Sequence, residues 1–196
     1  MPMIVAEVMF WAVSLVLIGS GAMKISQPDE FARFVTGASA SNGRSSNPLA
    51  GSAVLLARIT GVVEVGVGAL ALVNGGVVLG WVLGVMYLLF SGIIAYAIAT
   101  GAPSCGCFGS MSSKPSVGHL LVNLGSSTVA LAGAILSVRA VNEAIAADGP
   151  LVIAAAGVAV IFAGWLIFVL SGANRTILTG QSSKGRSTGS QSGQRH

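Results

Sequence analysis

The stretch VVLGWVLGVMYLLFSGIIAYAIA, residues 77–99, decides the fold class of this chain. It contains no charged side chain and is long enough to cross a bilayer core of about 30 Å as a helix. Four further apolar stretches have a similar length: residues 4–23, 49–73, 117–138 and 151–170. They lack the alternation of a membrane β-barrel, so helices are the structure that they predict.

The composition agrees with a membrane protein. Hydrophobic residues make up 54% of the 196 residues and charged residues only 8%, whereas soluble domains contain about 25% charged residues. We therefore predict an all-α integral membrane helical bundle with five spans, surrounded by a lipid bilayer. The net charge of +4 is small and spread along the loops and the tail, so nucleic acid is not an expected partner.

The first apolar stretch has features of both a cleaved signal peptide and a retained helix. Ser20-Gly21-Ala22 offers the small residues of a cleavage site. However, no lysine or arginine precedes the apolar residues, and Glu7 occupies the place of the basic region. We therefore expect an uncleaved first helix.

The polar segment after the first span predicts a short amphipathic helix on the membrane surface. Ser26 followed by Asp29 is typical of a helix N-cap with an acidic partner, and Pro28 then falls in the first helical turn. Apolar residues continue at helical spacing: Phe31, Phe34 and Val35.

Glycines recur every four residues at the start of the third span, at Gly76, Gly80 and Gly84. This spacing places bare backbone along one helix face, which allows a neighbouring helix to approach closely. We expect the face to serve helix packing.

Two charged residues lie within the second span. Arg58 precedes Glu64 by six residues, which is about 9 Å of rise and about 240° around the helix axis, so the two side chains do not face each other. Glu64 is expected to find a partner on another helix or to be protonated in the apolar interior. It is either a polar tie within the bundle or part of a functional site. Arg58 is expected to extend toward the nearer membrane surface.

Cys105 and Cys107 are the only cysteines, and they are separated by one glycine in the polar break between the third and fourth spans. Their spacing permits a disulfide, and so small a ring tends to be strained and active in exchange. It would add little stability, because bridging a short loop removes little unfolded-state entropy. Two thiolates with His119 would also suit Cu(I) or Zn(II), but a closed zinc site needs four ligands, so we assign no metal ligand. Two inert cysteines are the third interpretation.

His119 and Asn123 lie four residues apart at the start of the fourth span and therefore share a helix face close to the cysteines. A histidine near a thiol can lower the thiol pKa and raise the fraction of reactive thiolate. His119 is a candidate for this role, and an interfacial position without chemistry is the alternative.

The segment Pro103-Ser-Cys-Gly-Cys-Phe-Gly-Ser110 resembles the Cys-x-Cys-Phe-Gly loop of the MauE family, the membrane proteins of methylamine utilisation with DoxX-like, redox-associated relatives. Gly21-Ala-Met-Lys24, followed by Pro28-Asp-Glu-Phe31, is similar to the first loop of that family. Glu64 and Asn123 stand where the family usually has a glutamate and an asparagine. The resemblance covers about residues 4–138.

The chain departs from the family pattern in two places. Val122 stands where arginine is common, so any role of that charge is lost or moved to His119. The fifth span and the basic tail extend beyond the four-helix core of the family.

The resemblance implies a MauE-like four-helix redox bundle in residues 1–138. A loop and a fifth transmembrane helix would follow in residues 139–172, and a polar basic tail in residues 173–196. This tail is expected to be disordered, because it cannot bury enough apolar surface.

The resemblance also implies that Cys105 and Cys107 cycle between dithiol and disulfide with a thioredoxin-like partner. The client would be a disulfide-containing protein such as a methylamine dehydrogenase-like protein. Glu64, His119 and Asn123 would handle protons or position a quinone. The chain would then be a thiol–disulfide oxidoreductase; the alternative is a non-enzymatic membrane assembly factor or a Cu/Zn-binding protein.

The plasma membrane is the expected location, but two arguments disagree about the side of the cysteines. With the amino terminus outside, eight of the ten Lys and Arg residues face the cytoplasm, as the positive-inside rule prefers, and the cysteines do too. The resemblance and the persistence of disulfides outside the cytosol favour the outer face. We place the cysteine segment on the outer face.

Overall fold

The computed structural model describes residues 2–36, 49–102 and 115–170, and all regular structure in these residues is helical. The helices are α1 (Pro2–Ser26), α2 (Asp29–Thr36), α3 (Leu49–Asn74), α4 (Gly76–Ala99), α5 (Val117–Ile135), α6 (Val141–Asp148) and α7 (Pro150–Leu170).

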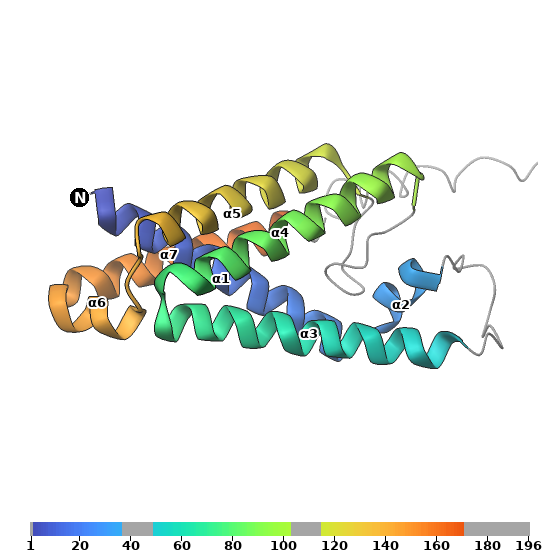
Figure 1. Cartoon of the computed structure of the whole chain (residues 1–196), viewed down its shortest axis with the longest axis horizontal. Coiled ribbons are helices and arrows are strands. Elements are labelled where there is room, and N and C mark those ends of the chain that lie inside the picture. Colours follow the sequence, from blue (N-terminus) through green and yellow to red (C-terminus); the bar gives the residue numbers. More distant parts are fainter. Residues whose placement is uncertain (1, 37–48, 103–114, 171–196) are drawn as a thin grey trace, which may run out of the picture.

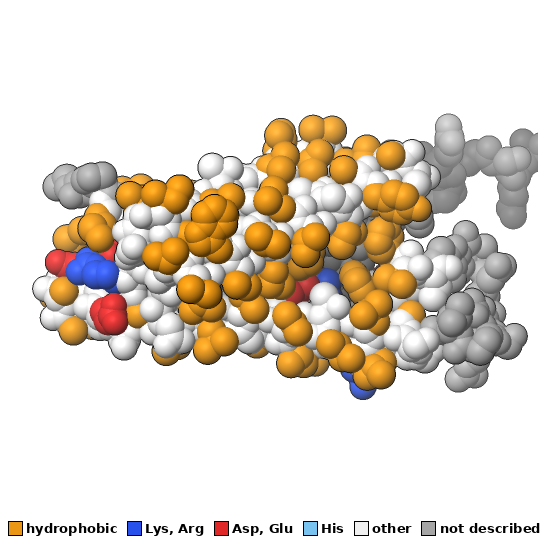
Figure 2. Space-filling model, in the orientation of Figure 1, with side chains coloured by type: hydrophobic (Ala, Val, Ile, Leu, Met, Phe, Trp, Pro, Cys, Tyr) orange, Lys and Arg blue, Asp and Glu red, His pale blue; other side chains and the backbone are white. Residues whose placement is uncertain are grey.

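Five of the described helices, α1, α3, α4, α5 and α7, are long and apolar enough to cross a membrane. Figure 2 shows hydrophobic side chains over the long flank of the molecule and a group of charged side chains at one end. This distribution is expected when lipid rather than water surrounds the flank. The prediction of an all-α membrane bundle with five spans is confirmed.

The five long helices run along the same axis of the molecule, with α2 at one end of the bundle and α6 at the other (Figure 1). Helix α1 occupies the centre, because it packs against α3, α5 and α7. Helix α4 packs against α5 and α3. Large side chains of α1 fill the core, and Phe10, Trp11 and Leu17 are each no more than 2% exposed.

Hydrogen bonds between helices reinforce this packing. The Tyr87 hydroxyl of α4 donates to the Val13 carbonyl oxygen of α1 at 2.6 Å. The Ser127 hydroxyl of α5 donates to the Gly84 carbonyl oxygen of α4 at 2.9 Å. Both donors are buried, so each bond satisfies a hydroxyl that would be costly to leave unpaired in an apolar interior.

The glycine face of α4 packs as predicted at two of its three positions. A Cβ atom on Gly80 would lie 2.7 Å from the Ala134 Cβ atom, and one on Gly84 would lie 2.6 Å from a Leu131 methyl carbon. Gly76 does not belong to this face, because a Cβ atom there would meet nothing within 4 Å. Its φ of 83° is left-handed, so Gly76 serves the tight turn into α4 instead.

The predicted helix after the first span is present as α2, but its predicted cap is wrong. Ser26 is the last residue of α1, and its hydroxyl donates to the carbonyl oxygens of Ala22 and Met23. The first helix continues one turn further than its apolar residues, which displaces the start of α2 to Asp29. Phe31 and Ala32 are the buried residues of α2.

The fourth span ends earlier than predicted, and a helix that was not predicted follows it. Helix α5 stops at Ile135 because Ser137 adopts a left-handed φ of 51°. The amide of Val138 then returns to the Gly133 carbonyl oxygen at 3.0 Å. Helix α6 occupies part of the segment expected to be a loop; its eight residues are too few to give a clear periodicity.

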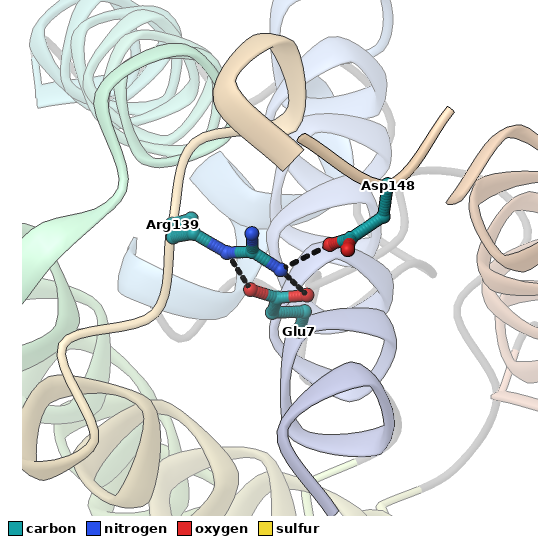
Figure 3. Close-up of polar contacts among 3 residues, drawn as sticks. All are labelled: Glu7, Arg139 and Asp148. Carbon is teal, nitrogen blue, oxygen red and sulfur yellow. Dashed lines mark hydrogen bonds and ion pairs between the residues drawn. The ribbon is translucent and has the colours of Figure 1, made fainter. Parts of the chain in front are cut away.

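A charged cluster fixes α6 to the start of α1 (Figure 3). The Arg139 guanidinium donates from Nε to Glu7 Oε1 at 2.7 Å and from Nη2 to Glu7 Oε2 at 3.2 Å. Nη2 also lies 2.6 Å from Asp148 Oδ2. The hydrogen bonds to Glu7, then those to Asp148, raise the pKa of Arg139 above its usual value. Because the Glu7 side chain is fully buried, this bidentate contact supplies the cation that a buried carboxylate needs.

Candidate functional site

The predicted redox residues Cys105 and Cys107 lie outside the described residues. The chain is described up to Ala102 and again from Pro115. The candidate site is therefore built from the described side chains at the end of the bundle where α4 ends and α5 begins, which is also the end that holds α2 (Figure 1).

The centre of this region is a buried ion pair between α1 and α3. The Lys24 ammonium lies 2.8 Å from Glu64 Oε1 and 2.9 Å from Glu64 Oε2. The two side chains are 2% and 0% exposed. Glu64 thus has its partner on another helix, as one of the two sequence interpretations expected, and this partner is a cation.

Two glycines explain how the pair forms. A Cβ atom on Gly21 would lie 2.5 Å from the Gly61 carbonyl oxygen, and one on Gly61 would lie 2.6 Å from the Gly21 carbonyl oxygen. Side chains cannot occupy such a crossing, so glycine is required on both helices. Each charged residue follows its glycine by three positions. Because helical side chains lean toward the amino terminus of their helix, Lys24 and Glu64 lean back toward the crossing point.

The Lys24 ammonium contacts residues of four helices. It donates to the Ser20 hydroxyl oxygen at 2.8 Å within α1 and pairs with Glu64 of α3. It also lies 5.8 Å from the ring centre of Phe31 in α2 and 5.2 Å from that of Phe90 in α4. Aromatic faces attract a cation at this range. The ammonium therefore links the short helix α2 to the membrane bundle.

Lys24 is the functional candidate that sequence reasoning missed. The predicted first span ended at Met23, which left Lys24 in the polar segment that follows it. In the structure it is 1% exposed within α1. The available signal was the four-residue spacing of Ser20 and Lys24, which places both on one helix face if the helix continues.

His119 and Asn123 form a local group at the start of α5. Ser116 caps this helix by accepting a hydrogen bond from the His119 amide, and its hydroxyl lies 2.9 Å from His119 Nδ1. The Asn123 side chain donates to the His119 carbonyl oxygen at 2.9 Å. His119 is 9% exposed, so the ring is held inside the bundle near the start of its helix.

The three supporting candidates lie on two helices. Glu64 belongs to α3, and His119 and Asn123 belong to α5; both helices pack against α1 and α4. The described residues therefore form two polar groups, the Lys24–Glu64 pair and the group at the start of α5. Within these residues there is no set of three or more His, Cys, Asp and Glu side chains that could hold a metal ion.

A groove lined mainly by apolar side chains lies between α2 and α4. Its volume is about 610 Å³, which is within the usual range for small-molecule sites. The groove residue Leu89 directly precedes Phe90, which contacts the Lys24 ammonium from α4. On α2, the groove begins at Phe34, three residues after Phe31, which contacts the same ammonium. The groove is lined by Phe34, Val35, Thr36, Leu89, Gly92, Ile93 and Tyr96.

Comparison with known proteins identifies a family for this chain. A family model described as "Methylamine utilisation protein MauE" matches residues 2–138. This range includes α1 to α5, both cysteines and the two polar groups, whereas α6 and α7 follow it. No curated protein and no solved structure matches the chain.

Proposed function

Because the chain belongs to the MauE family and is a multi-pass membrane protein, we propose that it is a membrane thiol–disulfide redox protein that works through Cys105 and Cys107. One observation carries the proposal: the only two cysteines of the chain stand one residue apart within the region that the family model matches. Inert cysteines would have no reason to lie only two positions apart. A disulfide that closes so small a ring would contribute little stability.

The neighbouring helices support this proposal. Helices α4 and α5 pack closely where α4 begins and α5 ends, at Gly80 and Gly84, and the cysteine segment connects the opposite ends of the same two helices. Ser116 fixes the start of α5 as its cap. A redox pair between two fixed helices can react with a visiting protein without rearrangement of the bundle.

The exchange step balances within the two proteins. A thiolate of the partner attacks the Cys105–Cys107 disulfide, which breaks the sulfur–sulfur bond and forms a mixed disulfide. The second partner thiolate resolves it, so the partner becomes oxidised and the chain becomes a dithiol. Two electrons and two protons have then moved to this chain. The proposed partner is thioredoxin-like, and a methylamine dehydrogenase-like protein with disulfides is the proposed client.

The polar groups have proposed supporting roles. His119, held by Ser116 at the start of α5, would raise the thiolate fraction of a nearby cysteine. Asn123 would position the first turn of α5 through its bond to the His119 carbonyl oxygen. Glu64, with Lys24, would hold α2 and the start of the bundle in place.

The electrons need an acceptor outside the chain, since no second cysteine pair exists. We propose that a bilayer quinone accepts them at the groove between α2 and α4, where Phe34, Ile93 and Tyr96 would contact the ring. A quinone supplies a two-electron, two-proton acceptor. The proposed location of the reaction is the outer face of the plasma membrane.

The test is thiol alkylation in intact cells with a membrane-impermeant reagent that adds a defined mass. We expect the wild-type chain to be labelled only after reduction, which reports both a disulfide and an outer location. Cys105→Ser and Cys107→Ser should each expose one reactive thiol and leave client disulfides unformed. The double variant is the control, because it contains no thiol at all.

Two results would contradict the proposal. A pair that is always reduced and that reacts only with a permeant reagent would place it in the cytoplasm without redox cycling. Loss of bound copper or zinc in the serine variants, with client disulfides unchanged, would favour the non-enzymatic metal-binding or assembly function instead.

A further inference from the structure

Arg58 differs from the other described cations because it has no acidic partner. Lys24, Arg33 and Arg139 each form an ion pair with a carboxylate. Arg58 is exposed on α3, and within the described part of the chain it forms no ion pair. Its positive charge therefore faces the surroundings of the protein uncompensated.

The surroundings of Arg58 are those of a lipid-facing surface. On the same stretch of α3, large apolar side chains are 46–60% exposed, namely Leu55, Leu56, Ile59, Val62 and Val63. Ala57 is fully buried, whereas Arg58, about 100° further around the helix axis, is exposed and lies outside the core. A lone arginine among lipid-exposed apolar side chains needs a counter-charge that the protein does not supply.

The depth of Arg58 allows it to reach the lipid headgroups. Helix α3 has 26 residues, about 39 Å at 1.5 Å per residue, so it is longer than a hydrocarbon core of about 30 Å. Arg58 lies nine residues after Leu49, about 14 Å from the start of α3. Its side chain leans toward that start, so it extends toward the nearer membrane surface.

An exposed aromatic residue indicates a membrane boundary near this end of the bundle. Tyr96 is 66% exposed three residues before the end of α4. Helix α4 ends at the side where α3 begins (Figure 1). Tyrosine and tryptophan favour the headgroup level, which is where an extended Arg58 would end.

We propose that Arg58 binds the phosphodiester of an anionic lipid in the leaflet next to α2. The choice of an anionic lipid follows from charge complementarity. The guanidinium carries one positive charge and presents paired donors that match phosphate oxygens. A phosphatidylglycerol neutralises it, whereas the amine of a zwitterionic lipid offsets the attraction. The apolar side chains around Arg58 contact the acyl chains of the same lipid.

Native mass spectrometry of the full chain, released from detergent micelles with added phosphatidylglycerol or phosphatidylcholine, tests this site. We expect Arg58→Leu to raise the Kd of the first phosphatidylglycerol on the order of fivefold and to leave the Kd of phosphatidylcholine unchanged. Arg58→Lys should retain most of the affinity for phosphatidylglycerol. Circular dichroism of each variant confirms that the helices are retained, and Arg58→Gln replaces Arg58→Leu if the latter does not fold.

Arg33→Gln is the matched control, since Arg33 is an exposed arginine already paired with Glu30. It should leave phosphatidylglycerol binding unchanged. An unchanged Kd in both Arg58→Leu and Arg58→Gln would overturn the proposal. An equal loss in Arg33→Gln would also overturn it, because the preference would then reflect net charge rather than a site.

Discussion

Removal of one partner of the Lys24–Glu64 pair should destabilise the bundle far more than removal of both. Lys24→Met leaves the Glu64 carboxylate, which is fully buried, without its cation at the α1–α3 crossing. Breaking a buried pair in this way typically costs about 3–5 kcal/mol. The double variant Lys24→Met with Glu64→Leu leaves neither charge of this pair buried. We expect its free energy of unfolding to be no more than about 1 kcal/mol below that of wild type, or to exceed it.

The assay is reversible unfolding in mixed micelles of increasing sodium dodecyl sulfate content, followed by circular dichroism. A double-mutant cycle of wild type, both single variants and the double variant isolates the coupling between the two side chains. Arg33→Gln serves as the control for loss of a cation. Its ion pair with Glu30 is exposed, so we expect its loss to change the free energy of unfolding by less than about 1 kcal/mol.

Two results would refute this reasoning. If Lys24→Met were no more destabilising than Arg33→Gln, the Glu64 carboxylate would not depend on its cation. If the double variant lost the sum of the two single losses, the residues would act independently. In either case the pair would not be the link between α1 and α3 that the geometry describes.

Three further predictions concern other contacts of the bundle. Gly21→Ala should separate α1 from α3 and cost roughly 1–3 kcal/mol in the same unfolding assay, whereas Gly66→Ala, with nothing within 4 Å of its new Cβ atom, should have little effect. Arg139→Leu should speed amide hydrogen exchange throughout α6, because the cluster in Figure 3 is lost. Asp148→Asn should speed it to a smaller extent. Equal protection in wild type and both variants would contradict the role of the cluster. Ser116→Ala should lower stability by about 1 kcal/mol and shift the imidazole nuclear magnetic resonance signals of His119.

The membrane architecture was predictable because it depends on single-residue properties summed over long windows. Residues 77–99 contain no charge, and no alternative structure satisfies their backbone in lipid. The amphipathic α2 was also predictable from the spacing of Phe31 and Phe34. Its boundary was not, since the continuation of α1 to Ser26 depends on the burial of Lys24, which is a tertiary effect.

The contents of the candidate site were predictable only in part. Glu64 stood out because a carboxylate in an apolar span requires a partner, but its partner lies 40 residues away in the sequence. Glu7 and Arg139 are separated by 132 residues, and no local pattern connects them. The positions of Cys105 and Cys107 fall outside the described residues, so their chemistry stays a prediction.

The central position of α1 has a consequence for biosynthesis. The partner of Lys24 is synthesised 40 residues after it, and that of Glu7 132 residues after it. A newly inserted α1 therefore carries two unneutralised charges in its membrane segment, which weakens its retention in the lipid until later helices arrive. The charges of α1 are therefore neutralised only once α3 and the Arg139 segment have been synthesised.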